Sequence, residues 1–213
     1  MKQTRPRGRP RSFDRDAAVD AAMLVFWEGG YETTSLAELT AALGIAPASL
    51  YAAFGSKDGL FYEAIARYAE RYGGFDSAMV AVAPSARELI VAMLEGAASA
   101  FTRPGLPRGC MVIGSALNCD SESGDVQRSL RDRRRANERD LCKRLQRAHA
   151  DGELVAAADP AALAKLVATL IQGMSVQARD GAGRAELLAV ARAARPVIAA
   201  SFARTRRRRR DTP

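Results

Sequence analysis

The sequence predicts an all-α protein of about nine helices, and three observations carry this prediction. Segments typical of strands are nearly absent, because β-branched residues rarely occur in runs. Alanine is abundant, and it has the highest intrinsic helix propensity. Apolar residues recur at intervals of three and four, which is the period of a helix with one buried face.

Capping residues and glycines divide the first part of the chain into four short helices. Asp14 is a suitable N-cap for the first helix, and Gly29 ends it. Gly44 ends the second, because glycine readily takes the positive φ of a tight turn. Pro47 suits the first turn of the third. The predicted helices cover residues 15–29, 35–43, 47–53 and 57–72.

Five further helices are predicted, at residues 85–102, 111–118, 124–150, 160–179 and 184–203. Asp159 followed by Pro160 is a helix start, and glycines at 181 and 183 indicate a tight connection. The chain is therefore predicted to have four parts. These are a flexible basic arm at 1–11, a three-helix domain with a helix-turn-helix at 12–56, a larger helical domain at 57–203 and a disordered arginine-rich tail at 204–213.

The composition excludes several classes of protein. With 48% hydrophobic and 26% charged residues among 213, the chain can bury a core, so wholesale disorder is excluded. The longest charge-free apolar run near the start, at 21–27, is far shorter than the ~20 residues of a bilayer span, so a membrane-spanning segment is not expected. No apolar stretch follows the basic residues at the start, so a secretory signal is not expected either. Three cysteines without a CxxC motif predict neither a disulfide framework nor a zinc site. We expect a cytoplasmic protein without a metal or cofactor.

The net charge of +8 is concentrated at the two ends of the chain. Residues 1–11 hold five Lys or Arg and no acid, and residues 204–213 hold six Arg and one Asp. Each end therefore carries +5, which leaves −2 for the remainder. Such ends are either solvated tails or contacts for a polyanion.

Residues 35–53 have the dimensions of a helix-turn-helix, whose second helix can enter the major groove of DNA. Spacing alone does not separate this motif from an ordinary helix pair joined through glycine. Over residues 12–62, however, the sequence resembles the DNA-binding domain of the tetracycline-repressor (TetR) family of bacterial transcriptional regulators. The ungapped match includes Ala18-Val19-x-Ala21-Ala22-x-x-Val25-Phe26-x-x-x-Gly30-Tyr31-x-x-Thr34-Ser35, Leu39, Ala42-Leu43-Gly44-Ile45 and Ser49-Leu50-Tyr51-x-x-Phe54-x-Ser56-Lys57-x-x-Leu60.

The resemblance implies a transcriptional repressor that binds a palindromic operator as a homodimer and is released by a small-molecule effector. It also implies a phosphate contact from Thr34, base contacts from Pro47, Ala48 and Ser49, and contacts with the DNA backbone from Tyr51 and Lys57. The predicted recognition helix holds no Arg, Asn or Gln for a bidentate base contact. We therefore expect contacts with thymine methyl groups, or readout of DNA shape.

The two basic ends have different predicted roles. Residues 6–10, Pro-Arg-Gly-Arg-Pro, resemble the core of an AT-hook, so Arg7 and Arg9 are expected in a narrow A·T minor groove. A disordered arm that adds only non-specific attraction is the alternative. The arginine tail is expected to be disordered, or to add salt-dependent affinity. The basic stretches at 131–135 and 143–147 are interpreted as a solvated face.

By the same resemblance, the C-terminal part would bind the effector and form the dimer. Apolar stripes on the last two predicted helices are either core or dimer interface. The interface candidates are Leu163, Leu166, Val167, Leu170, Leu187, Leu188, Ala191, Val197 and Ile198. Aromatic and methionine side chains are candidates for a pocket that takes a small apolar ligand, namely Tyr62, Tyr68, Tyr72, Met93, Phe101, Met111 and Met174.

Cys110 leaves a second mechanism open. It follows Arg108 at a predicted helix start, where the helix dipole and the guanidinium would favour a reactive thiolate. Some members of the TetR family with Gly-Cys at a similar place sense electrophiles or oxidants, so Cys110 is either a redox sensor or an inert core thiol. An architectural protein that binds DNA without preference is the remaining alternative. An enzyme is not expected, since His149 is the single histidine and no glycine-rich phosphate loop follows a strand.

Overall fold

The computed structural model describes residues 13–73, 83–117 and 124–203. Within these ranges the chain forms nine α-helices and no β-strand, which confirms the predicted all-α class. The helices are α1 (Arg15–Gly29), α2 (Leu36–Leu43), α3 (Pro47–Phe54), α4 (Lys57–Tyr72), α6 (Ala86–Ala100), α7 (Met111–Leu117), α8 (Gly124–Ala150), α9 (Pro160–Arg179) and α10 (Arg184–Ala200).

The largest difference from the predicted boundaries is at the end of α10. The helix ends at Ala200, three residues earlier than expected. Phe202 instead pairs with Leu154 in an isolated antiparallel bridge, and the Ala203 N–H donates to the carbonyl of Glu153 at 2.8 Å. These backbone bonds hold the last described residues against the segment between α8 and α9.

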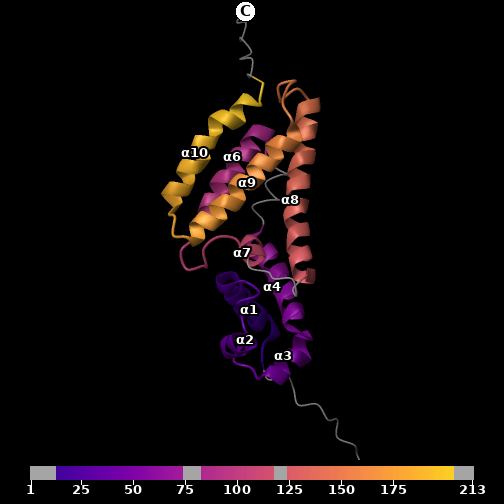
Figure 1. Ribbon diagram of the computed structural model, residues 1–213, viewed down its shortest axis with the longest axis vertical. Coiled ribbons are helices and arrows are strands. Elements are labelled where there is room, and N and C mark those ends of the chain that lie inside the picture. Colours follow the sequence, from indigo (N-terminus) through magenta and orange to yellow (C-terminus); the bar gives the residue numbers. More distant parts are fainter. Residues whose placement is uncertain (1–12, 74–82, 118–123, 204–213) are drawn as a thin grey trace, which may run out of the picture.

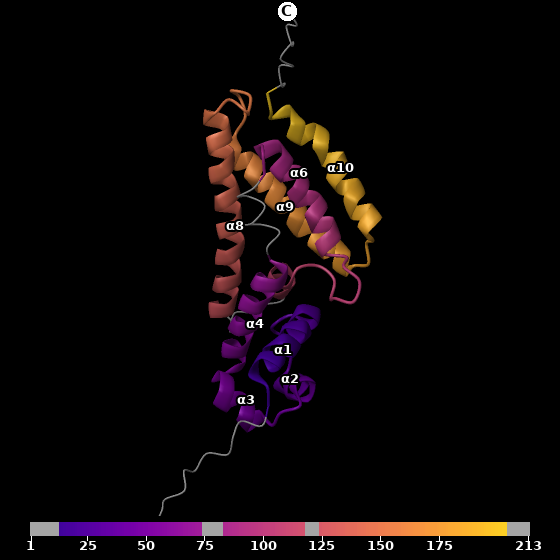
Figure 2. The same cartoon turned by 180° about the vertical axis from the view of Figure 1, so that it is seen from behind.

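The helices form two bundles along an elongated molecule (Figure 1). The lower bundle in that view contains α1, α2, α3 and the start of α4, and the upper bundle contains α6, α8, α9 and α10. The short α7 lies at the junction and contacts α1, α4, α8 and α9. Figure 2 shows from behind that α8 runs along the upper bundle on one side while α10 covers the other. The helix-turn-helix therefore lies at one end of the molecule.

α1 is the central helix of the lower bundle, where it packs against α2, α4 and α7. It buries two neighbouring faces, with Ala18, Val19, Ala22, Met23, Phe26 and Trp27 all inside. Phe26 meets Phe61 of α4 edge to face, with ring centroids 5.0 Å apart, and Tyr31 meets Phe61 at 4.9 Å. This aromatic cluster packs α1 and the segment that follows it against α4 within the lower bundle.

Side-chain caps begin five of the described helices, and the predicted cap at Asp14 is confirmed. The Asp14 carboxylate accepts hydrogen bonds from the backbone N–H groups of Asp16 and Ala17 at the start of α1. Ser35 and Glu38 form a reciprocal capping box on α2. The remaining described side-chain caps are Ser56 on α4, Ser85 on α6 and Asp159 on α9.

In the upper bundle, α6 packs against α10, α9 and α8. Among the described helices, α9 alone is long and apolar enough to cross a membrane as a single helix by length and composition. Here α9 packs against α6, α7, α8 and α10, so its apolar side chains serve a helical core.

Candidate DNA interface and ligand cavity

The α2–turn–α3 segment has the geometry of a helix-turn-helix. The two helices meet at 91°, and Gly44 makes the turn at φ 63° and ψ 29° in the left-handed region, where a side chain would be strained. Leu39 of α2 and Leu50 of α3 are fully buried and anchor both helices on the lower core. The outer face of α3 is thereby fixed relative to α1.

The exposed face of α3 is small and uncharged. Pro47 and Ala48 are exposed at its first turn, Ser49 is half-buried, and the Tyr51 side chain is 47% exposed. These are the residues that the sequence predicts at DNA. No side chain caps the start of α3, since its N-cap is Ala46. This helix end can approach a groove closely, but it has few groups for direct base readout.

Two of the residues predicted to contact DNA have partners within the chain itself. The Thr34 side chain is buried, and its hydroxyl donates to the Gly30 carbonyl at 2.6 Å. The Lys57 Nζ lies 4.3 Å from the ring centroid of Tyr31, a cation–π contact that leaves Lys57 half-buried. The resemblance to the family motif, which implies DNA contacts from Thr34 and Lys57, does not reveal these partners. Arg7 and Arg9 lie outside the described residues.

The Tyr31 phenol makes the stability of the folded chain depend on pH in the alkaline range. Its hydroxyl donates to the Asp58 carboxylate, and burial together with this bond raises the pKa of the Tyr31 phenol above its ordinary value of 10.0. At high pH the unfolded chain therefore loses this proton first, so the Tyr31 contribution to stability is complete below pH 10 and declines above it.

We expect the wild-type protein to be about 1 kcal/mol more stable than Tyr31→Phe at neutral pH, because the variant lacks the hydrogen bond to Asp58. Above pH 10 the gap should close by about 1.4 kcal/mol per pH unit, since only the unfolded wild type gains the ionised phenol. Urea unfolding of both proteins between pH 7 and 11 measures the gap. A gap that stays constant over this range would contradict the assigned role of Tyr31.

A second site is a cavity of about 350 Å³ at the junction between the bundles. Its walls come from α4, α6, α8, α9 and the start of α7. Four of the predicted pocket residues line it, namely Tyr68, Tyr72, Met93 and Phe101. Three do not line it: Tyr62 is on the surface of α4, while Met111 and Met174 are buried in the two cores. Periodicity identifies inward-facing residues but does not separate a core position from a cavity wall.

Cys110 also lines this cavity. It is half-buried, and its backbone N–H donates to Oγ of Ser175 in α9 at 2.9 Å. Cys142, the other cysteine of the described part of the chain, is half-buried on α8 and is not a cavity residue. Cys119 lies outside the described residues.

The α8 wall of the cavity is polar. Arg133, Arg134, Asn137 and Glu138 all face the cavity from this helix. Arg133 is exposed, in agreement with the predicted solvated face, whereas Arg134 is half-buried at the cavity and departs from it. Apolar neighbours on α8 are sparse, so no sequence pattern indicates that one of its arginine-rich turns borders a cavity.

The cavity touches the DNA-binding bundle through Trp27. The Trp27 ring lies 4.8 Å from that of Tyr68 and 5.2 Å from that of Tyr72, both cavity residues. Its Nε1–H donates to the Gly109 carbonyl at 3.1 Å, next to Cys110. The C-terminal turn of α1 is thus in contact with two walls of the cavity.

Arg179 at the end of α9 binds the C-terminal turn of α1. Its guanidinium donates to the carbonyls of Trp27 at 3.1 Å and Glu28 at 3.0 Å. These are C-terminal helix carbonyls, which a cation stabilises. Gly109 leaves room for this arrangement, because a Cβ there would lie 2.8 Å from the Ser175 carbonyl oxygen and 2.9 Å from Cγ of Arg179.

We expect Gly109→Ala to lower the free energy of unfolding by about 2–4 kcal/mol, from the left-handed backbone and the clash together. Gly105→Ala is the matched control, because Gly105 has the same φ of +76° but nothing within 4 Å of its added Cβ. It should cost only about 1 kcal/mol. Thermal or urea unfolding compares the two, and equal losses would show that the close packing at Gly109 has no energetic weight.

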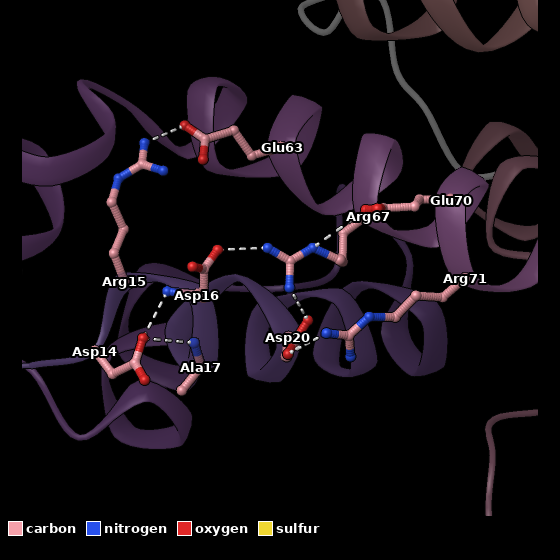
Figure 3. Close-up of polar contacts among 9 residues, drawn as sticks. All are labelled: Asp14, Arg15, Asp16, Ala17, Asp20, Glu63, Arg67, Glu70 and Arg71. Atoms are coloured by element: carbon pink, nitrogen blue, oxygen red, sulfur yellow. Dashed lines mark hydrogen bonds and ion pairs between the residues drawn. The ribbon is translucent and has the colours of Figure 1, made fainter.

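Ion pairs join α1 to α4 along their exposed side (Figure 3). Arg67 of α4 binds Asp16 at 2.6 Å and Asp20 at 2.7 Å, and Arg71 binds the same Asp20 at 2.9 Å. Near α3, Arg15 binds Glu63 at 2.6 Å. These contacts and the aromatic cluster join α4 to α1 on two sides.

The predicted dimer residues fall into two groups. Leu163, Val167, Leu187, Ala191 and Ile198 are buried in the upper core of the chain itself. Leu166, Leu170 and Leu188 are half-buried, and Val197 is 61% exposed. A side chain already covered within one chain adds little area to a contact, so the second group holds what is available to a partner.

Comparison with known proteins agrees with this architecture. A family model described as bacterial regulatory proteins of the tetR family matches residues 18–64. A second, the tetracyclin repressor-like C-terminal domain, matches residues 86–200. The chain belongs to the TetR family. The resemblance seen over residues 12–62 is thereby confirmed, and it extends to the upper bundle.

Relatives within the TetR family are transcriptional regulators. The HTH-type transcriptional repressor ComR of Escherichia coli K12 is 39% identical over 186 residues, which cover 87% of this chain and 89% of ComR. The repressor BdcR of the same organism is 39% identical over 129 residues, 59% of this chain and 64% of BdcR. The regulator CifR, solved as a triple cysteine mutant with 26-bp double-strand operator DNA, is 46% identical with a TM-score of 0.83. That likeness covers 89% of this chain and 98% of the CifR chain.

Proposed function

We propose that this TetR-family chain is a repressor that binds a palindromic operator as a homodimer and leaves it when a small molecule fills the junction cavity. One observation carries the proposal: α4 begins beside α3 at Lys57 and ends in the cavity wall at Tyr68 and Tyr72. A single helix thus connects the DNA-binding face with a ligand-sized space. The repressors ComR and BdcR and the operator complex of CifR support the DNA-binding part.

The charge distribution supports a role for the N-terminal arm. Residues 12–66 contain eight acidic side chains and only two basic ones, Arg15 and Lys57. Both have partners within the bundle, as described above. Because phosphate contacts dominate the affinity of proteins for DNA, the cations must come largely from elsewhere in the chain. The +5 arm at residues 1–11, with Arg7 and Arg9, is adjacent in sequence.

The proposed dimer uses apolar side chains of α9 and α10 that the chain does not fully bury. Leu166 and Leu170 are half-buried one turn apart on α9, and Val190 and Val197 are 40% and 61% exposed on α10. Exposed apolar side chains such as these two valines are typical of an interface. A twofold dimer would present two α3 helices to the two half-sites of a palindrome.

Release would follow from contacts that differ between the free and filled cavity. A ligand that displaces Tyr68 and Tyr72 moves the C-terminal half of α4, and the ion pairs of Arg67 and Arg71 carry α1 with it. Trp27 and Arg179 provide the pivot at the other end of α1. Typical coupling of 1–3 kcal/mol between two sites would weaken operator binding by about 5–150-fold.

Selection from random duplex DNA tests the proposed function directly. The full-length protein is incubated with the pool in about 0.15 M salt, and bound duplexes are sequenced. We expect one enriched palindrome. Recovery of unrelated sequences with equal affinity would overturn the repressor and favour an architectural DNA-binding protein.

A thiol-based sensor of electrophiles is the second candidate, favoured by the place of Cys110 in the cavity wall. Iodoacetamide is a suitable probe: the Cys110 sulfur forms a bond to the acetamide carbon, iodide leaves, and the thiol proton passes to solvent. We expect alkylation to release the operator from wild type and from Cys142→Ser, but not from Cys110→Ser. Release that persists in Cys110→Ser would exclude this sensor.

A further inference from the structure

The junction cavity has two chemically different sides. Aromatic and aliphatic side chains line it from α4, α6 and α9, including Tyr68, Met93, Phe101, Val167 and Ile171. The charged side chains all come from α8. A ligand that fits both sides therefore has an apolar body and one polar end directed at α8.

The charge on the α8 side is positive. The Glu138 carboxylate is already paired with Nζ of Lys165 on α9 at 2.6 Å, so its negative charge is balanced locally. Arg134 is half-buried, and one of its guanidinium nitrogens donates to the Val112 carbonyl at 3.5 Å. Arg133, on the same turn, makes no hydrogen bond or ion pair with another described residue. Two guanidinium groups thus border the cavity. The single acidic side chain among its lining residues, Glu138, is already paired with Lys165 of α9.

We propose that the effector is an amphipathic monoanion, whose carboxylate binds Arg133 and Arg134 while its apolar body lies between α4, α6 and α9. Guanidinium groups bind carboxylates through two parallel charged hydrogen bonds, which gives both affinity and orientation. The cavity of about 350 Å³ is at the small end of ligand pockets, so a single ring with a short chain suits it. This inference rests on the proposed function, because it assigns the chemistry of the molecule that releases the operator.

The chain contains its own reporter for this test. Trp27 is the only tryptophan of the 213 residues, and its ring contacts both Tyr68 and Tyr72 of the cavity wall. Its fluorescence is titrated in the full-length protein with 4-phenylbutyrate and, separately, with the neutral isostere 4-phenylbutyramide. We expect the acid to bind at least tenfold more tightly than the amide, because only the acid forms charge-assisted bonds to α8.

Variants that replace arginine with neutral glutamine test which side chains cause the preference for the acid over the amide. Arg133→Gln with Arg134→Gln should bind both compounds alike, whereas Arg135→Gln with Arg139→Gln should keep the preference, since neither residue of that pair lines the cavity. Failure of both compounds to bind, equal binding by wild type, or a preference that survives in the first variant would overturn the proposal. If the acid binds with the expected preference but does not dissociate the selected operator, the ligand class stands and the proposed release mechanism fails.

Discussion

Replacing Arg7 and Arg9 together with alanine is expected to weaken operator binding at least a hundredfold in about 0.1 M salt. The folded DNA-binding bundle carries eight acidic and two basic side chains over residues 12–66, so it repels the phosphates it must approach. A dimer has four of these arm arginines. Each cation that reaches a phosphate contributes about 0.9 to the dependence of log K on log salt, so the slope should fall by up to about 4.

Arg206→Ala with Arg207→Ala is the matched control, because it removes the same charge from the other end of the sequence. α10 ends at the end of the molecule opposite α3 (Figure 1), so a loss of no more than a few fold is expected. Fluorescence anisotropy with the selected duplex at several salt concentrations gives both affinities and slopes. Equal losses of affinity in the two double variants would mean that residues 1–11 contribute only non-specific electrostatic attraction to DNA.

Trp27→Ala should lower the free energy of unfolding by about 3–5 kcal/mol. The Trp27 side chain is 2% exposed, it stacks edge to face on Tyr68, and its N–H satisfies the Gly109 carbonyl. Alanine would leave a cavity and an unpaired carbonyl at the point where the two bundles meet. Because the variant has no tryptophan, the urea transition is followed by far-ultraviolet circular dichroism.

Tyr62→Ala is the control, because it removes an aromatic side chain from the surface of α4. Tyr62 is 37% exposed and does not line the cavity, so its removal should cost less than about 1 kcal/mol. A Trp27→Ala loss as small as that of Tyr62→Ala would mean that the two bundles are held together without this contact.

The fold could be predicted from the sequence because its signals are local. Asp14, Ser35 and Asp159 cap helices within two or three residues, and Gly44 makes its turn without help from distant parts of the chain. The helix-turn-helix followed from such signals and from an ungapped motif. The boundary missed most, at the end of α10, depends on a bridge between Leu154 and Phe202, nearly fifty residues apart.

The site was less predictable because its contacts join distant segments. Arg179 reaches Trp27 across 152 positions, and Trp27 reaches Gly109 across 82. Helical periodicity gives no information about such pairs. It also gave Met111 and Met174 the same weight as Met93, although only Met93 faces the cavity. Arg133 and Arg134 were not predicted at the cavity, because arginine is far more often a surface residue, and Arg133 is in fact exposed.

The stoichiometry and affinity of the complex with the selected duplex test the dimeric repressor most directly. Native mass spectrometry and a titration compare the full palindrome with a duplex that carries one intact half-site. We expect two chains per palindrome and binding at least a hundredfold weaker to the single half-site, since each chain alone presents one small, uncharged α3 face. One chain per duplex, or equal affinity for the two duplexes, would contradict a dimeric operator-binding repressor.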